Sequence, residues 1–422
     1  MKAETRLFIG LFCIQTAMMI GVMIIPFFVK NELGGTDRAA ALAYGTQMVG
    51  LGVVCLLSAP FLARAKSSAR CALWGCLGFG VFYTVCVLCR TPLQYYVLGA
   101  ASMGALAIAW PALIAWLGGQ PDEKLRTRSL SYFNIIVGVG LVVGGLLAGW
   151  LYDTDYRLAF AAVGVLSAIG VLAIYTLPHE SVYFGAGEAQ PEGEQPESPD
   201  THWRANEAHM YCIWLAAIAA WGLVGATRTV YATHVDSLLK TGSMVVLSQG
   251  APLHTFVSGG SVGAATLYSW MQSGLSLAFM VTALIMGRTR YWERRFWLLA
   301  AVQVATAGAI YLLAGSRSLL LILICHLVFG ANTAFCNLAA QLYSVANPAL
   351  KHKRSAINQG LISLAGFFVP LGVAQAAVQY GPIMPFRFMP VTMVAVIGVE
   401  GLLLVRGMRS YLRHKAAAAE GS

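Results

Sequence analysis

Twelve long apolar runs follow one another along this chain of 422 residues. As an α-helix, a run of about 20 apolar residues crosses the roughly 30 Å hydrocarbon core of a bilayer. The runs are continuous rather than alternating, which favours helices over the strands of a membrane barrel. We expect spans at 7–28, 40–63, 71–89, 93–118, 133–151, 158–177, 210–231, 263–286, 296–314, 319–343, 357–380 and 386–405. The sequence therefore predicts an all-α membrane protein with twelve transmembrane helices.

The composition agrees with lipid as the solvent. Apolar residues make up 58% of the chain and charged residues only 11%, whereas a soluble domain carries about a quarter charged residues. The formal charge of +10 does not indicate a nucleic-acid partner, because the basic residues form short clusters between apolar runs and no continuous basic face. The first run is too long for the core of a cleavable signal and lacks a small-residue cleavage site, so we expect it to be a span.

One segment differs from the rest and divides the chain. Residues 179–208 combine Gly, Pro and Ser with acidic residues, a composition that cannot bury a core and is typical of a flexible linker. We expect an N-terminal six-helix bundle at 1–178, an acidic linker at 179–208, a C-terminal six-helix bundle at 209–407 and a tail at 408–422. The unusually long segment 232–262, between the seventh and eighth spans, is expected to be either a cap or a partner site.

The positions of the basic residues predict the orientation. Most of the 28 Lys and Arg residues fall in the loops that share one side of the membrane with both termini and the linker, and the count alternates loop by loop. Such loops face the cytoplasm under the positive-inside rule. We expect an integral, monomeric protein of the bacterial inner (plasma) membrane with both termini in the cytoplasm.

The two halves repeat one another at an offset of about 226 residues, which indicates an internal duplication. The matching positions are Arg128 with Arg354, Gly140 with Gly366 and Gly104 with Gly330, and, two residues closer, Arg64 with Arg288 and Arg70 with Arg294. With its six plus six spans and the stretch Gln120-Pro121-Asp122-Glu123-Lys124-Leu125-Arg126-Thr127-Arg128, the chain resembles the major facilitator superfamily. That resemblance implies two pseudo-symmetric six-helix bundles and secondary transport by alternating access.

The fifth run is rich in glycine. Gly140-x-x-x-Gly144 and Gly145-x-x-x-Gly149 have the spacing that permits close approach of helices in lipid, and the resemblance implies packing against the other half. It also implies conformational roles for Arg64, Arg70, Arg128, Arg288 and Arg354. The loop 59–70 departs from the family pattern because it lacks the usual Gly and Asp. No Arg lies in the fourth span, which makes drug/proton antiport less favoured.

The resemblance further implies that the first, fourth, seventh and tenth spans line the path of a solute. Polar side chains are costly in lipid, so those on these spans should face the path or one another. The candidates are Gln15, Trp110, Trp221, Arg228, His326, Asn332, Asn337 and Gln341. Each also has a structural interpretation as an interhelical contact, with a backbone carbonyl as the partner of His326. Gln47, Gln272 and Gln303 are expected to serve packing only.

Charged residues within the spans bear on the solute and on the driving force. Arg228 either extends to the membrane interface or binds an anionic solute through its planar guanidinium, and Lys30 could help only at the outer mouth. Glu400 is expected to form an interfacial pair with Arg406. No other carboxylate lies in the spans, so uniport, anion exchange or coupling through His326 is favoured over carboxylate-based symport.

No motif indicates an enzyme, a cofactor or a metal site. Gly259-Gly260-Ser261-Val262-Gly263 matches the nucleophile-elbow pattern but precedes a membrane span rather than joining a strand to a helix. Cys86 and Cys89 lack a second ligand pair. The sequence predicts a secondary transporter of a small organic solute, either an anion or a polar metabolite. The alternatives are a non-transporting sensor or assembly factor and, less favoured, a polytopic membrane enzyme.

Overall fold

The computed structural model describes residues 3–64, 67–118, 123–177, 202–241, 243–245, 263–289, 291–345 and 351–420, and helices dominate them. The first half contains α1 (Ala3–Phe27), η1 (Phe28–Glu32), α2 (Asp37–Arg64), α3 (Ser68–Val85), η2 (Cys86–Leu88), α4 (Pro92–Gly118), α5 (Glu123–Thr154) and α6 (Tyr156–Tyr175). The second half contains α7 (His202–Ala226), η4 (Thr227–Tyr231), α8 (Ala232–Lys240), α10 (Ala264–Arg288), α11 (Phe296–Gly315), α12 (Leu319–Val345), α13 (Lys351–Tyr380) and α14 (Met384–Glu420).

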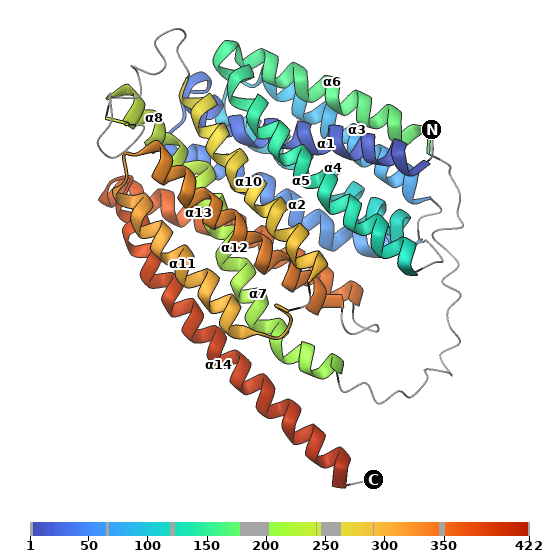
Figure 1. Cartoon of the computed structure of the whole chain (residues 1–422). Helices are drawn as coiled ribbons and strands as arrows, with labels where there is room; N and C mark the ends of the chain where they lie inside the picture. The colour runs from blue at the N-terminus through green and yellow to red at the C-terminus, as the bar shows by residue number, and fades with distance from the viewer. Residues whose placement is uncertain are drawn as a thin grey trace.

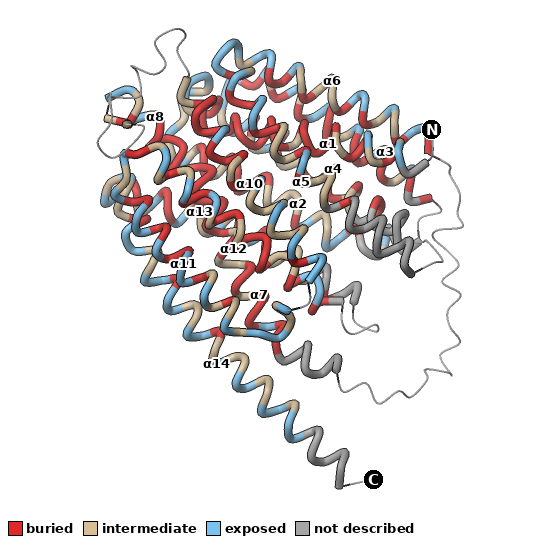
Figure 2. The backbone as a smooth tube through the Cα atoms, in the orientation of Figure 1, coloured by how far each residue is buried: buried red, intermediate tan, exposed pale blue. Residues whose placement is uncertain are grey.

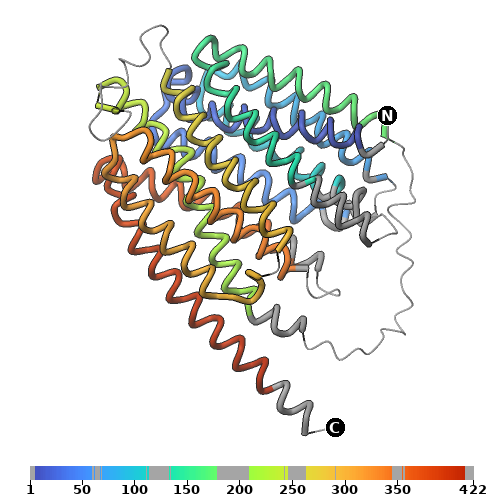
Figure 3. The backbone as a smooth tube through the Cα atoms, in the orientation of Figure 1, coloured from blue at the N-terminus to red at the C-terminus, as the bar shows by residue number. Residues whose placement is uncertain are grey.

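The twelve predicted spans are confirmed. Among the described residues, 12 helices are long and apolar enough to cross a membrane. The structure extends the first span to Glu32 and the seventh to Lys240, because the chain continues through η1 and η4 without leaving a helical path. Figure 3 shows that both chain ends lie toward one end of the bundle, while α8 lies at the opposite end (Figure 1). We call these the terminal end and the α8 end.

Helices of the same half pack mainly against one another. In the first half α1 contacts α5 and α6, while α4 contacts α2 and α3. In the second half α7 contacts α12, α13 and α14, and α11 lies between α12 and α14. The two halves meet where α5 packs along α10 and where α2 packs along α13 (Figure 1).

The distribution of burial agrees with a lipid environment. Figure 2 shows buried segments in the middle of the bundle and exposed segments around its outside. Large apolar side chains are exposed on the outer helices, among them Leu57, Trp74 and Val391. The opening span of each half is the most enclosed: 78% of the first span's apolar window and 72% of the seventh span's are buried, against 11% for the last span. The first and seventh spans therefore occupy the centre.

The glycines of α5 serve two different contacts. A Cβ on Gly144 would lie 2.5 Å from the carbonyl oxygen of Thr16 on α1, and Gly140 also faces α1. A Cβ on Gly149 would collide with the backbone of Ala265 on α10, and Gly145 faces Ser273 of the same helix. Gly140 and Gly144 therefore let α5 pack closely on α1 within its own half. Gly145 and Gly149 let it pack closely on α10 of the opposite half.

Several sequence interpretations fall outside the described residues. They concern the linker at 179–201, the segment 246–262 with its Gly259–Gly263 pattern, and the side chains of Arg64 and Arg128. The described part of the 232–262 segment does dock on the bundle: the Val245 N–H donates to the carbonyl of Arg317 at 3.0 Å, and its carbonyl accepts from Leu319 N–H at 2.9 Å. This short pairing holds the chain after α8 against the start of α12.

The α5–α10 contact makes a direct prediction. Gly149→Ala should lower the melting temperature of the purified protein, because the added methyl meets backbone atoms that cannot move aside; such overpacking costs about 1–3 kcal/mol. Gly372→Ala on α13 is the matched control, since a Cβ there meets nothing within 4 Å. It should leave stability equal or slightly higher, because Ala replaces Gly in a helix. Equal melting temperatures for both variants would contradict close packing at Gly149.

Candidate functional site

A π-helical turn interrupts the central span of each half near the α8 end. The turn η1 continues α1, and η4 continues α7. Such turns widen the helix locally and are frequent at functional sites. They place Lys30 and Arg228 in the neighbourhood where the two halves meet, since η4 contacts both α1 and α2. The irregular segments thus bring the two cations of these spans toward the boundary between the halves.

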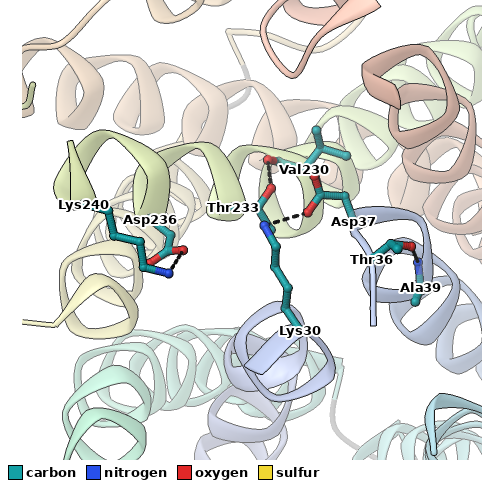
Figure 4. Close-up of polar contacts among 8 residues, drawn as sticks. All are labelled: Lys30, Thr36, Asp37, Ala39, Val230, Thr233, Asp236 and Lys240. Carbon is teal, nitrogen blue, oxygen red and sulfur yellow. Dashed lines mark hydrogen bonds and ion pairs between the residues drawn. The ribbon is translucent and has the colours of Figure 1, made fainter. Parts of the chain in front are cut away.

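Lys30 is already engaged at this boundary. Its Nζ lies 3.0 Å from Asp37 Oδ1, and both side chains are partly exposed. Figure 4 shows this pair beside Val230 and Thr233 of the second half. A partly exposed ion pair of this kind contributes about 0–1 kcal/mol. Lys30 therefore belongs to the α8-end contact of the halves.

Arg228 differs from Lys30 because it is buried and has no acidic partner among the described residues. Only 8% of the residue is exposed, and its Nε has no hydrogen-bond partner. Within the described part of the chain, the ion pairs are Lys30–Asp37 and Lys240–Asp236. A side chain that extended to the lipid interface would be exposed, so the burial argues against that alternative. A buried cation without an anion is costly, and an anionic ligand would relieve that cost.

Aromatic side chains from both halves lie near the helical segment that carries Arg228. Its guanidinium lies within electrostatic range of the Tyr268 hydroxyl, which donates to the carbonyl of Thr227 at 3.2 Å. The Tyr268 ring lies 5.7 Å from that of Phe27 on α1. Tyr44 of α2 lies against Gly225, one turn before Arg228. Residues of α1, α2 and α10 thus pack around the segment that carries Arg228. The sequence analysis had not singled out Tyr268.

Other central helices also carry buried polar atoms without a hydrogen-bond partner. Both side-chain atoms of Gln272 are buried without a partner, and Gln272 lies one helical turn from Tyr268, on the same face of α10. Trp221 Nε1 and Gln15 Oε1 are likewise buried and unpaired. Buried polar atoms are ordinarily hydrogen-bonded, so these three side chains are ready to bind a polar solute or water. We expected Gln272 to serve packing, but its unpaired amide makes it a further candidate.

The candidates on α12 divide into two groups. His326 and Asn332 are buried, and His326 Nδ1 lies 2.8 Å from the carbonyl of Ile322, as its structural interpretation expects. Its Nε2 and the Asn332 Nδ2 have no partner. Asn337 is half-buried and Gln341 exposed, further toward the terminal end. The His326 ring lies 6.0 Å from that of Tyr231 in η4, so His326 belongs to the Arg228 region while Gln341 does not.

Two candidates of the first half contact α5. The Trp110 ring packs edge-on against Phe133, with centroids 6.0 Å apart and an interplanar angle of 86°. Gln15 lies against Gly140: a Cβ added to Gly140 would lie 2.9 Å from the Gln15 Cβ.

A separate buried polar cluster lies in the α4 region. There the Tyr95 hydroxyl lies 3.0 Å from that of Tyr83 and accepts a hydrogen bond from Gln47 Nε2 at 3.4 Å. Gln47 therefore links helices, as expected.

The expectation for Glu400 is wrong. The residue is fully buried, and Gln303 Nε2 donates to its Oε1 at 2.8 Å. No described ion pair joins it to Arg406, which is exposed. The short separation along the chain suggested an interfacial pair of Glu400 with Arg406. However, α14 packs against α7 and α11, and Glu400 points into the interior of the second half. Gln303 consequently has a polar role beyond packing.

A carboxylate joins the two halves at the α8 end. Asp153, at the end of α5, accepts a hydrogen bond from the backbone N–H of Thr266 at 2.8 Å. Thr266 lies in the first turn of α10, where the helix leaves N–H groups free and favours a negative charge. Asp153 therefore supplies the helix cap that the neighbouring Gly263 cannot supply with a side chain. The halves are in contact at this end of the bundle.

A family model described as Major Facilitator Superfamily matches residues 7–370. The chain belongs to this superfamily. The resemblance to this superfamily and the twelve-helix fold, both expected from the sequence, are thereby confirmed. Membership also makes it an integral membrane protein of a transporter family.

Curated relatives match a smaller part of the chain. The glucose-6-phosphate exchanger SLC37A2 of Bos taurus is 27% identical over 177 residues, which are 40% of this chain and 34% of that protein. The protein of the same name from Homo sapiens is 25% identical over 177 residues, with the same coverage. The matches thus span about a third of the length of these relatives.

Solved structures share the fold over nearly the whole chain. A peptide transporter POT in complex with sulfate has a TM-score of 0.74 and 13% identity, covering 97% of this chain and 95% of the other. The nucleoside transporter NupG has a TM-score of 0.67 and 14% identity, with 97% and 99% covered. The human organic anion transporter MFSD10 has a TM-score of 0.59 and 14% identity, with 95% and 98% covered. At these identities the likeness concerns the fold.

The Asp153 contact predicts a shift in conformation. Asp153→Asn should favour states that are open at the α8 end, because the negative charge that the first half places at the N-terminus of α10 is lost. Asn keeps an acceptor oxygen for the Thr266 N–H, but loss of a negative charge at a helix N-terminus costs up to about 1 kcal/mol, which corresponds to at most about a fivefold change in the population ratio. Distances between spin labels placed on α5 and α10 would measure the change.

Asp155→Asn provides the matched control. Asp155 caps α6 by accepting from Arg157 N–H at 2.8 Å, a contact inside one half. That variant should leave the label distances unchanged. Identical distance distributions for both variants would show that Asp153 does not hold the halves together.

Proposed function

We propose that the protein is a secondary transporter that moves a small organic anion across the membrane by alternating access, with Arg228 as the contact for the anion. The observation that carries this proposal is the burial of Arg228 without an acidic partner among the described residues. The planar guanidinium donates two parallel hydrogen bonds to a carboxylate or a phosphate. A bound anion would satisfy the charge and the unpaired Nε together.

The unpaired polar groups on the central helices suit the remainder of such a solute. Gln272 offers both a donor and an acceptor, Trp221 offers a donor, and Gln15 an acceptor. These groups would bind hydroxyl or amide functions, while Tyr268 and Phe27 cover apolar surface. Relatives that are named for glucose 6-phosphate exchange carry a solute with an anionic group and several hydroxyls. The likeness supports a solute of this class, and a sugar phosphate is the first one to test.

The duplicated architecture supports alternating access. The first and seventh spans are the most enclosed, and the halves meet through α5 with α10 and α2 with α13. Rocking of one half against the other about these contacts would expose a central site to each side in turn. We further propose that the protein is a monomer of the bacterial inner membrane, with both termini in the cytoplasm, and that it has no enzymatic activity.

The transport proposal predicts the behaviour of Arg228 variants. In proteoliposomes, Arg228→Ala should lower the uptake of radiolabelled glucose 6-phosphate, or of the best anion from a panel of phosphates and carboxylates, at least about tenfold. The reason is the loss of a charge-assisted hydrogen bond worth about 1.5–3 kcal/mol. Arg228→Lys should retain part of the rate, because it keeps the charge but not the planar geometry.

Arg317→Ala is the control, since Arg317 is exposed near the α8 end. It should transport like the unchanged protein. Uptake that survives Arg228→Ala unaltered for every anion would contradict the proposed site. Binding of an anion without uptake would instead favour the sensor alternative, and chemical conversion of the solute would favour the enzyme alternative.

A further inference from the structure

Among the described spans, the one on α14 is the least buried. Only 11% of its apolar window lies inside the bundle, and Figure 2 shows exposed segments along this helix. Val391 and Leu402 are each 71% exposed. They lie about three helical turns apart, so they share one face of α14. This apolar face is turned toward the lipid.

The same face of α14 becomes basic toward the terminal end. Arg406 lies one turn beyond Leu402, and Arg409 and Arg413 follow at the i+3 and i+7 positions from Arg406. Residues at these spacings stack on one side of a helix. All three arginines are exposed. We call Arg406, Arg409 and Arg413 the basic stripe.

The neighbouring helix α11 shows the level at which the basic stripe begins. The two helices lie side by side and run in opposite directions (Figure 1). Gln303 of α11 donates to Glu400 of α14 at 2.8 Å, so these two residues are level with one another. Two turns nearer the terminal end, after about 10 Å, lie Phe296 at the start of α11 and Gly407 on α14. The basic stripe therefore begins level with the first turn of α11.

The start of α11 carries side chains that are typical of a membrane interface. Trp297 and Tyr291 are both exposed, and Trp and Tyr are enriched where lipid headgroups meet the hydrocarbon. The Arg295 guanidinium lies 3.6 Å from the centroid of the Tyr291 ring, and Arg295 is exposed as well. A fourth cation is thus held at the level where the basic stripe begins.

No acidic partner neutralises the basic stripe among the described side chains. The described ion pairs, Lys30–Asp37 and Lys240–Asp236, lie toward the α8 end. The carboxylate nearest in sequence to the stripe is Glu400, which is fully buried and bonded to Gln303. Arg406, Arg409 and Arg413 are therefore available to an anion from outside the chain.

The last span of the first half shows that such a stripe is not a general need of an outer helix. The α6 helix is also exposed to lipid, for example at Leu172 and Tyr175. Its last turn contains no basic residue. A span in this position is thus stable in the membrane without a basic stripe, so the stripe on α14 calls for an explanation of its own.

We propose that the basic stripe and Arg295 form a binding surface for the headgroup of an anionic phospholipid, whose acyl chains lie along the apolar face of α14. Basic clusters next to a transmembrane helix attract anionic lipids, and guanidinium groups bind phosphate through paired hydrogen bonds. A phospholipid supplies the phosphate at the level of Arg406 and the apolar chains at the level of Leu402 in one molecule. A soluble anion supplies only the first of these.

Lipid retention by the purified full-length protein tests this surface. Native mass spectrometry would compare phosphatidylglycerol with phosphatidylcholine of the same acyl chains, and the unchanged protein should retain phosphatidylglycerol in preference. Changing Arg406, Arg409 and Arg413 together to Gln should weaken the retention of phosphatidylglycerol at least about tenfold, because each cation near the surface contributes to the attraction. Retention of the uncharged-overall phosphatidylcholine should stay the same.

Two matched variants separate the stripe from net charge and from folding. The combined change Arg38→Gln, Arg90→Gln and Arg317→Gln removes three exposed arginines toward the α8 end. It should retain phosphatidylglycerol like the unchanged protein. Lysine at all three positions of the basic stripe should keep most of the retention, because Lys preserves the charge and loses only the paired geometry.

The position of the lipid can be measured independently. A photoactivatable phosphatidylglycerol, reconstituted with the unchanged protein, should crosslink to peptides that contain residues 402–413, and this crosslink should be lost in the glutamine variant of the stripe. Loss of retention in that variant alone supports the proposal. Equal retention in the glutamine variant and the unchanged protein overturns it, as an occupant of another kind such as the acidic linker at 179–208 would produce. An equal loss in the α8-end variant also overturns it, because net charge would then be the cause.

Discussion

A polar group without a hydrogen-bond partner is energetically costly in the hydrocarbon core of a membrane, and this constraint determines the structure. Helices satisfy their own backbone hydrogen bonds, so the chain crosses the bilayer twelve times as helices. Side chains that need a polar partner must turn inward, toward other helices. The buried amides, hydroxyls and charges of α1, η4, α10, α12 and α14 are therefore few, and each one marks either a contact between helices or a position where a ligand would complete the bonding.

The fold could be predicted from the sequence because it depends on long runs of apolar residues. Each span is about 20 apolar residues, and a pattern of that length is hard to mistake. The glycines of α5 could be predicted as packing residues for the same reason, since their four-residue spacing is itself the signal. Which neighbour each pair meets could not be predicted, because Gly140 and Gly144 face α1 while Gly145 and Gly149 face α10, and that depends on the rotation of α5 in the bundle.

Only some residues of the candidate site could be predicted from the sequence. Arg228 stands out in any sequence of this kind, because a cation inside an apolar run is rare. Gln272 and Tyr268 were missed because their span was not expected to line the path; their one-turn spacing on α10 was the available signal. Glu400 was misjudged because a sequence shows how far a residue lies from a helix end but not which way its side chain points. Its partner Gln303 lies 97 positions away, and only tertiary structure joins them.

The cap on α10 has a consequence for the order of assembly. The first turn of α10 has no capping side chain of its own and receives one from Asp153, at the end of α5. During synthesis the first six spans emerge before α10, so the carboxylate is already in place when that turn forms. A C-terminal half made alone would therefore lack the hydrogen bond that Asp153 accepts from the Thr266 N–H at the boundary surface.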